Sequence, residues 1–171
     1  MSLQSVSKDE IRELLSKGWM THDAMWFAHS VAALGIDKTN EVNRAAVRSM
    51  AHIELSRLKK LLGVQDIRSF GELQSFVTTA SELIKPRFMK YRLRFEAPDV
   101  MRWEWEDGQC FAYQGIKSLG LLDRYRCGIF VRVEAWLDGL GIAFERTPAG
   151  DACSMRNGGR CNREFRVSFA T

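Results

Sequence analysis

The chain has 171 residues, of which 46% are hydrophobic and 27% charged, and its formal net charge is +4. This length and apolar content suit one domain with a proper core, well above the size at which small domains need covalent or metal staples. No apolar run reaches the roughly 18 residues that a membrane-spanning helix needs, so we expect no membrane partner.

The basic residues give no sign of a nucleic-acid interface. Lysines and arginines are interleaved with acidic residues along the chain, as on an ordinary solvated surface. The densest basic run, residues 87–94, is not accompanied by a recognised nucleic-acid-binding motif, so we do not expect a nucleic-acid partner.

The N-terminus lacks the apolar core of a signal peptide, which predicts a cytoplasmic protein. Thiols stay reduced in that compartment. For the four cysteines, this favours metal binding or free thiols over disulfides.

The first half of the chain has the apolar periodicity of helices. A capping-box pair opens a helix over residues 8–17, and Gly18 is a natural stop. A second helix is predicted over residues 22–34, where Gly35 ends it, and a third over residues 38–62.

A fourth helix follows a second capping box, Ser69 with Glu72, and closes at Lys85 because the residue before a proline avoids helical angles. After Lys85 the apolar residues alternate with polar ones, which is the spacing of strands. Residues 87–106 predict a hairpin with one buried face, since aromatic and charged residues alternate along its second strand. Two helices and then two strands complete the chain, over about 109–120, 123–139, 142–146 and 163–169.

These elements predict an α+β fold, in which N-terminal helices pack on a four-stranded antiparallel sheet and the C-terminal half has ββααββ order. We expect residues 1–85 to form a helical region that covers a pocket and makes a homodimer. Residues 86–171 form the predicted ligand-binding region, and the two together make one compact domain.

Three cysteines lie at the ends of separate predicted elements. Cys127 opens a helix, Cys153 follows a strand and a turn, and Cys161 comes eight positions later, just before the last strand. Sulfurs in such positions can converge on one point, and thiolates are strong ligands for Zn²⁺. The main hypothesis is a zinc ion that fastens the helix to the sheet; unrelated buried thiols and a disulfide are the alternatives.

The strand–strand–helix–helix–strand–strand order, with C-x₇-C before a Phe-rich last strand, resembles the 4-vinyl reductase ligand-binding domain over roughly residues 85–171. The resemblance implies a small apolar or aromatic ligand. It also implies a structural zinc held by Cys127, Cys153, Cys161 and one acidic residue.

The chain departs from that family at the acidic ligand. The family has it three residues before the middle cysteine, where this chain has Gly150. Asp151, Cys110 or a water molecule is then the fourth ligand. Four protein ligands make a closed, structural site, whereas a water makes an open site that is able to catalyse.

Weaker similarities leave the activity open. The ending from Gly158 to Phe165, G-x-x-C-x-x-x-F, is similar to the L-2-amino-thiazoline-4-carboxylic acid hydrolase family, which implies a hydrolase as one alternative. The 4-vinyl reductase fold is shared with subunits of vesicle-tethering complexes, which implies a non-catalytic scaffold as another. The segment from Trp19 to Phe27 resembles an uncharacterised prokaryotic family.

Two groups of residues are candidates for ligand binding. Histidines and a tryptophan share one predicted helical face, and aromatic residues are densest around the hairpin and the helices after it. The candidates are His22, Trp26, His29, Trp103, Trp105, Tyr113 and Trp136. Partly buried histidines and an ordinary aromatic core are the alternatives. No catalytic constellation is present in the sequence, so whether the protein is an enzyme stays open.

Overall fold

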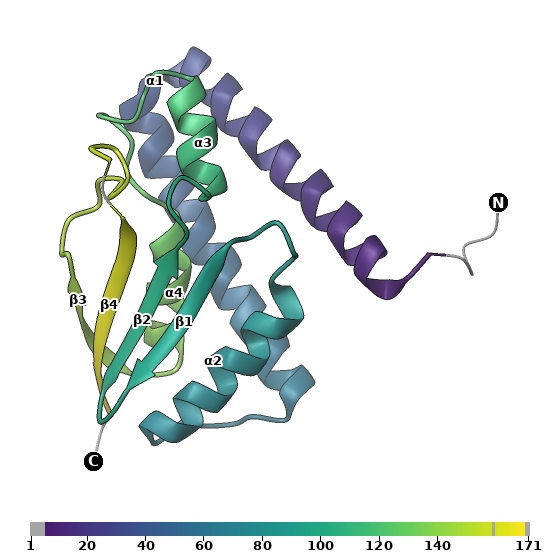
Figure 1. Cartoon of the computed structure of the whole chain (residues 1–171), viewed down its shortest axis with the longest axis vertical. Helices are drawn as coiled ribbons and strands as arrows, with labels where there is room; N and C mark the ends of the chain where they lie inside the picture. Colours follow the sequence, from purple (N-terminus) through teal and green to yellow (C-terminus); the bar gives the residue numbers. More distant parts are fainter. Residues whose placement is uncertain (1–5, 159, 170–171) are drawn as a thin grey trace.

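A four-stranded antiparallel sheet lies against helices in the computed structural model, which describes residues 6–158 and 160–169 (Figure 1). The predicted α+β class is confirmed. The elements in chain order are α1 (Lys8–Leu62), α2 (Phe70–Ile84), β1 (Tyr91–Glu96), β2 (Val100–Trp105), α3 (Phe111–Ser118), α4 (Ile129–Gly139), β3 (Ala143–Thr147) and β4 (Cys161–Ser168).

Helix α1 is bent at one residue. Gly35 has φ 77° and ψ 163°, a conformation that other residues rarely adopt, and the two parts of the helix diverge there (Figure 1). The predicted end at Gly35 is therefore confirmed as a break. The predicted end at Gly18 is wrong, because one glycine inside a helix costs only about 1 kcal/mol and the helix continues through it. We call residues 8–34 the arm.

The far end of the arm is tied to the connection between α2 and β1. Asp9 forms an ion pair with Arg87 at 2.8 Å, and the Glu13 carboxylate accepts a hydrogen bond from the backbone N–H of Arg87 at 2.9 Å. The Arg12 guanidinium donates to the carbonyl of Glu82 at 3.2 Å. The arm is thus held at the Gly35 bend and at its N-terminal end.

The strand order is β1-β2-β4-β3, and every neighbouring pair is antiparallel. In β4 the buried and exposed side chains alternate, with Phe165 and Val167 on the inner face, as predicted. The register places Trp105 opposite Cys161 and Trp103 opposite Arg163. The last strand therefore brings a cysteine and an arginine next to the tryptophans of the hairpin.

Helix α4 is almost completely buried, from Phe130 to Leu137 apart from Arg132. It packs on the second part of α1, where a methyl group at Gly139 would lie 2.6 Å from a Leu55 methyl. The predicted start of this helix at Asp123 is wrong.

The reason is that the backbone before α4 is engaged elsewhere. Arg126 bridges to Ala152, and the Cys127 N–H donates to the Asp151 carbonyl at 2.7 Å, so these residues are extended rather than helical.

Candidate functional site

The four cysteines come from four different segments. Cys110 is the N-cap of α3, Cys127 lies two residues before α4, Cys153 is in the loop after β3, and Cys161 is the first residue of β4. All four are free thiols, and all but Cys127 are buried. We call them the thiol cluster.

Burial and the charges of other thiols raise the pKa values of Cys110 and Cys161. Burial is the main cause that raises the pKa of Cys161, and ionisation of Cys110, Cys127 and Cys153 raises it further. Burial also raises the pKa of Cys110 to about 12, with a contribution from Cys127 and Cys153. The ionisation of one thiol thus disfavours the ionisation of the next, unless a cation lies among them.

Backbone N–H groups at the starts of α3 and α4 offset part of the effect of burial on two of the cysteines. Burial raises the pKa of Cys127, but hydrogen bonds from the backbone N–H groups of Ile129 and Phe130 act in the opposite direction. The backbone of Tyr113 and Ala112 acts in the same way on Cys110. Such N–H donors stabilise the ionised sulfur.

An arginine is enclosed beside the cluster. Arg163 is 1% exposed; its guanidinium donates to the Gly150 carbonyl at 3.0 Å and lies 4.7 Å from the centre of the Phe130 ring. Its Nε–H is buried and has no hydrogen-bond partner in the part of the chain that the structure describes. The sequence could have predicted that Arg163 is buried, because it lies two residues before Phe165 and therefore on the same face of the strand.

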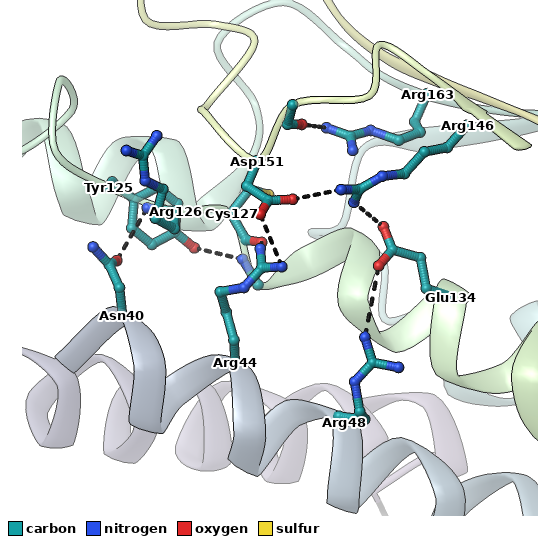
Figure 2. A network of polar contacts seen from close by, with 12 residues as sticks. Asn40, Arg44, Arg48, Tyr125, Arg126, Cys127, Glu134, Arg146, Asp151 and Arg163 are labelled. Carbon is teal, nitrogen blue, oxygen red and sulfur yellow. Dashed lines mark hydrogen bonds and ion pairs between the residues drawn. The ribbon is translucent and has the colours of Figure 1, made fainter. Parts of the chain in front are cut away.

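Asp151, a predicted zinc ligand, is engaged by two arginines (Figure 2). Arg146 donates to it at 2.8 Å, and Arg44 of α1 forms an ion pair with it at 3.1 Å. Burial raises the pKa of Asp151, but these arginines outweigh it and hold the pKa below its usual value. Arg146 also pairs with Glu134 of α4, so the network joins α1, α4 and β3.

The thiol cluster contains ligands of the type that zinc prefers. Within residues 6–158 and 160–169, no three His, Cys, Asp or Glu side chains are already arranged around a point as metal ligands. Four thiols nevertheless match the number and type of ligand in a structural zinc site. The unpartnered Nε–H of Arg163 is a donor of the kind that metal-bound ligands accept. The cysteines, rather than the arginine-bound Asp151, would hold such an ion.

A cavity of about 260 Å³ lies between the arm and the body of the protein. Most of its lining side chains are apolar. The arm, the sheet, α3 and α4 all contribute, and the larger lining residues include Trp19, Met20, Phe27, Tyr91, Trp103, Trp105, Phe111, Tyr125, Arg132 and Trp136.

Three of the tryptophans that line the cavity have indole N–H groups without partners in the described part of the chain. The indole N–H groups of Trp103, Trp105 and Trp136 are buried and unpaired among the described residues, and these residues are 7%, 5% and 3% exposed. An unpaired buried donor costs about 1–3 kcal/mol. Arg132, in contrast, already donates twice to the Glu54 carboxylate and lies over the Trp136 ring.

The structure separates the predicted ligand residues into two groups. Trp103, Trp105 and Trp136 line the cavity. Four others are outside its lining: the exposed His22, Trp26 and His29, and the half-buried Tyr113.

The arm instead turns another helical face toward the cavity, with Met20, Ala24 and Phe27 at i, i+4 and i+7. That spacing was present in the sequence, but the residues on the face with the histidines repeat at the same helical spacing. The sequence alone therefore did not show which face is buried. The sequence reasoning also missed Tyr91, Tyr125 and Arg132 as lining residues.

Residues 4–84 match the model of a family of unknown function (DUF6125). The match spans the arm, the rest of α1 and α2, and it ends before the sheet. No curated protein and no solved structure matches the chain. Among the helices of the described ranges, none has the combination of length and apolar character that crossing a bilayer requires.

Proposed function

We propose that this protein binds a small apolar or aromatic molecule in the cavity between the arm and the sheet, as a stand-alone binding or sensor domain. The observation that supports this best is the cavity, because three of its lining residues are tryptophans whose indole N–H groups have no partner among the described residues. Mainly apolar pockets with a few polar groups are the usual form of small-molecule sites. The sequence resemblance of residues 85–171 to the 4-vinyl reductase ligand-binding domain supports the same function.

The donors also define the kind of ligand. Three indole N–H groups call for a molecule that carries acceptors, such as a carbonyl or ether oxygen. Because Arg132 is already paired with Glu54, a neutral acceptor suits the cavity better than a carboxylate.

Binding is better supported than hydrolysis. The sequence left open a hydrolase that would use the pocket or an open metal site. The histidine candidates for such a pocket, His22 and His29, lie outside the cavity lining. Tyr91 also lines the cavity, but its hydroxyl shares a hydrogen bond with Ser81 at 2.9 Å, and burial raises its pKa. Both effects make it a poor general base. A pure scaffold without a ligand, the other alternative, has no use for the cavity.

The thiol cluster and the arm complete the proposal. A structural zinc held by Cys127, Cys153, Cys161 and Cys110 would fasten β4 and α4 together. The exposed apolar side of the arm supports a homodimer. Four free thiols suit a reducing compartment, which agrees with a cytoplasmic protein.

Nuclear magnetic resonance of the indole N–H groups tests ligand binding. Acetophenone, an aromatic ketone, is titrated into ¹⁵N-labelled protein, with ethylbenzene as the matched probe that lacks an acceptor. We expect saturable downfield shifts at Trp103, Trp105 or Trp136 with acetophenone, and at most small shifts with ethylbenzene.

Variants assign the signals and control the experiment. Trp103→Phe should weaken acetophenone binding about threefold to tenfold through the loss of one hydrogen bond. Trp26→Phe, at an exposed position outside the lining, should leave it unchanged. If neither probe gives a saturable shift, the proposed function is contradicted.

A further inference from the structure

Arg163 carries a charge that the protein encloses without an evident counter-charge. The residue is 1% exposed, and within the described ranges it makes no ion pair with a carboxylate. Removing a guanidinium from water costs several kcal/mol unless an anion compensates for it. A side chain that only fills space here would be apolar, so the position of the charge needs an explanation.

The polar neighbours of Arg163 account for only part of its donor capacity. One amino group donates to the Gly150 carbonyl, and the guanidinium lies 4.7 Å from the centre of the Phe130 ring. The Nε–H has no partner in the described residues. The nearby Glu134 is already engaged by Arg146 and lies 3.9 Å from Arg48. The carboxylates around Arg163 are therefore committed to other arginines.

The remaining groups near Arg163 that become negative when they lose a proton are the thiols of the cluster. Arg163 interacts electrostatically with Cys127 and Cys161, and it follows Cys161 by two positions on the same face of β4. On the neighbouring strand it lies opposite Trp103, which lines the cavity.

We propose that Arg163 is the counter-cation of a metal–thiolate centre formed by Cys110, Cys127, Cys153 and Cys161, and that its Nε–H donates to one of the thiolates. This inference rests on the structural zinc proposed above. Four thiolates and one Zn²⁺ carry an excess of two negative charges. The guanidinium and the backbone N–H groups at the starts of α3 and α4 balance that excess.

The test measures metal affinity in variants of Arg163. Zinc is removed by competition with a chelator of known affinity, and the thiolate-to-metal charge-transfer band of the Co²⁺-loaded protein reports the ligand set. Arg163→Met keeps most of the volume and removes the charge, and we expect its zinc affinity to fall roughly tenfold or more, as for other groups that support metal ligands. Arg163→Lys keeps the charge and loses the planar donor, so its affinity should lie between that of Arg163→Met and wild type.

Arg156→Met is the matched control, because Arg156 is an exposed arginine in the same segment between Cys153 and Cys161. Its zinc affinity should equal that of wild type. Metal-free Arg163→Met should be at least as stable to urea as metal-free wild type, because no unpaired charge is then buried. This second measurement separates loss of metal binding from a failure to fold.

Wild-type affinity in Arg163→Met, or weaker binding by Arg163→Lys than by Arg163→Met, would overturn the role of Arg163 while leaving the zinc site in place. Wild-type protein that binds neither Zn²⁺ nor Co²⁺ would overturn the zinc proposal and the role of Arg163 with it.

Discussion

At the scale of single residues, Asp151 illustrates how a candidate ligand can have other partners. Its position next to the expected acidic ligand made it a candidate for zinc. In the structure its carboxylate is held by Arg146 and Arg44, which belong to β3 and to α1. These contacts give Asp151 a role in joining elements that are far apart in the sequence.

We expect Asp151→Asn to destabilise the protein at pH 7 by about 1–3 kcal/mol, toward the lower end because the carboxylate is partly exposed to solvent. Urea unfolding measures this. Since the folded protein holds the pKa of Asp151 below its usual value, the stabilisation is present above the ordinary aspartate pKa of about 3.9 and is lost as the pH falls through the lower folded value.

The difference between Asp151→Asn and wild type should therefore shrink in acid. Asp107→Asn is the control, because Asp107 is exposed and 3.9 Å from its partner Arg160; it should change stability by less than about 0.5 kcal/mol. An Asp151→Asn variant as stable as wild type at pH 7 would show that the network contributes nothing.

The sequence identified the cysteines and several cavity aromatics, since these residue types and spacings carry chemical information on their own. It did not identify Arg163, because a charged residue at the start of a strand is normally exposed. What encloses Arg163 is the pairing of β4 with β2 and the packing of Phe130, and both are contacts between distant parts of the chain.

At the scale of elements, two glycines at which the sequence predicted a helix end have different roles. Gly18 continues a helix, and Gly35 bends it with a positive φ. The local sequence predicted a stop at both, because it does not contain the contacts of the arm with Arg87 and Glu82. Likewise, the start of α4 depends on a bridge to Ala152.

The continuous arm has an exposed apolar side. Large side chains there are exposed to solvent, with Leu14 at 72% and Leu15 at 66%, and Ile11 and Trp26 lie with them. Trp19 and Met25 are also partly exposed, although both border the cavity. Extended apolar patches of this kind on soluble proteins mark interaction sites. A second copy of the chain presents the same stripe, and two identical stripes are complementary about a twofold axis.

We therefore expect a dimer by light scattering after size-exclusion chromatography. The double substitution Leu14→Glu with Leu15→Glu should give a monomer with an unchanged helix signal, since both side chains are already exposed. Leu61→Glu is the matched control, because Leu61 is 70% exposed on the second part of α1, and it should remain a dimer. A wild-type monomer at every concentration would contradict pairing through the arm.

At the scale of the whole molecule, the β2–β4 register makes the thiol cluster and the cavity neighbours. Cys161 is opposite Trp105, and Arg163 is opposite Trp103. The predicted ββααββ order was enough to expect one antiparallel sheet. It was not enough to place the last strand beside the second, because several strand orders satisfy the same sequence of elements.

Metal removal should consequently affect both stability and ligand binding. Protein made without chelator should contain about one zinc per chain by elemental analysis. When free zinc exceeds its dissociation constant about 1,000-fold, binding stabilises the fold by about 4 kcal/mol, so chelation should lower the unfolding midpoint by roughly 8–16 °C.

Chelation should also weaken the binding of acetophenone, because the zinc would fasten α4, which carries Trp136, to β4, which pairs with the strand that carries Trp103 and Trp105. Readdition of zinc should restore both properties in wild type. Cys153→Ser provides the comparison, since a protein that lacks one ligand should respond weakly to either treatment. Wild-type protein that contains no zinc and whose midpoint is insensitive to chelator would leave the cluster as four buried thiols, and the cavity would then have to keep its shape by packing alone.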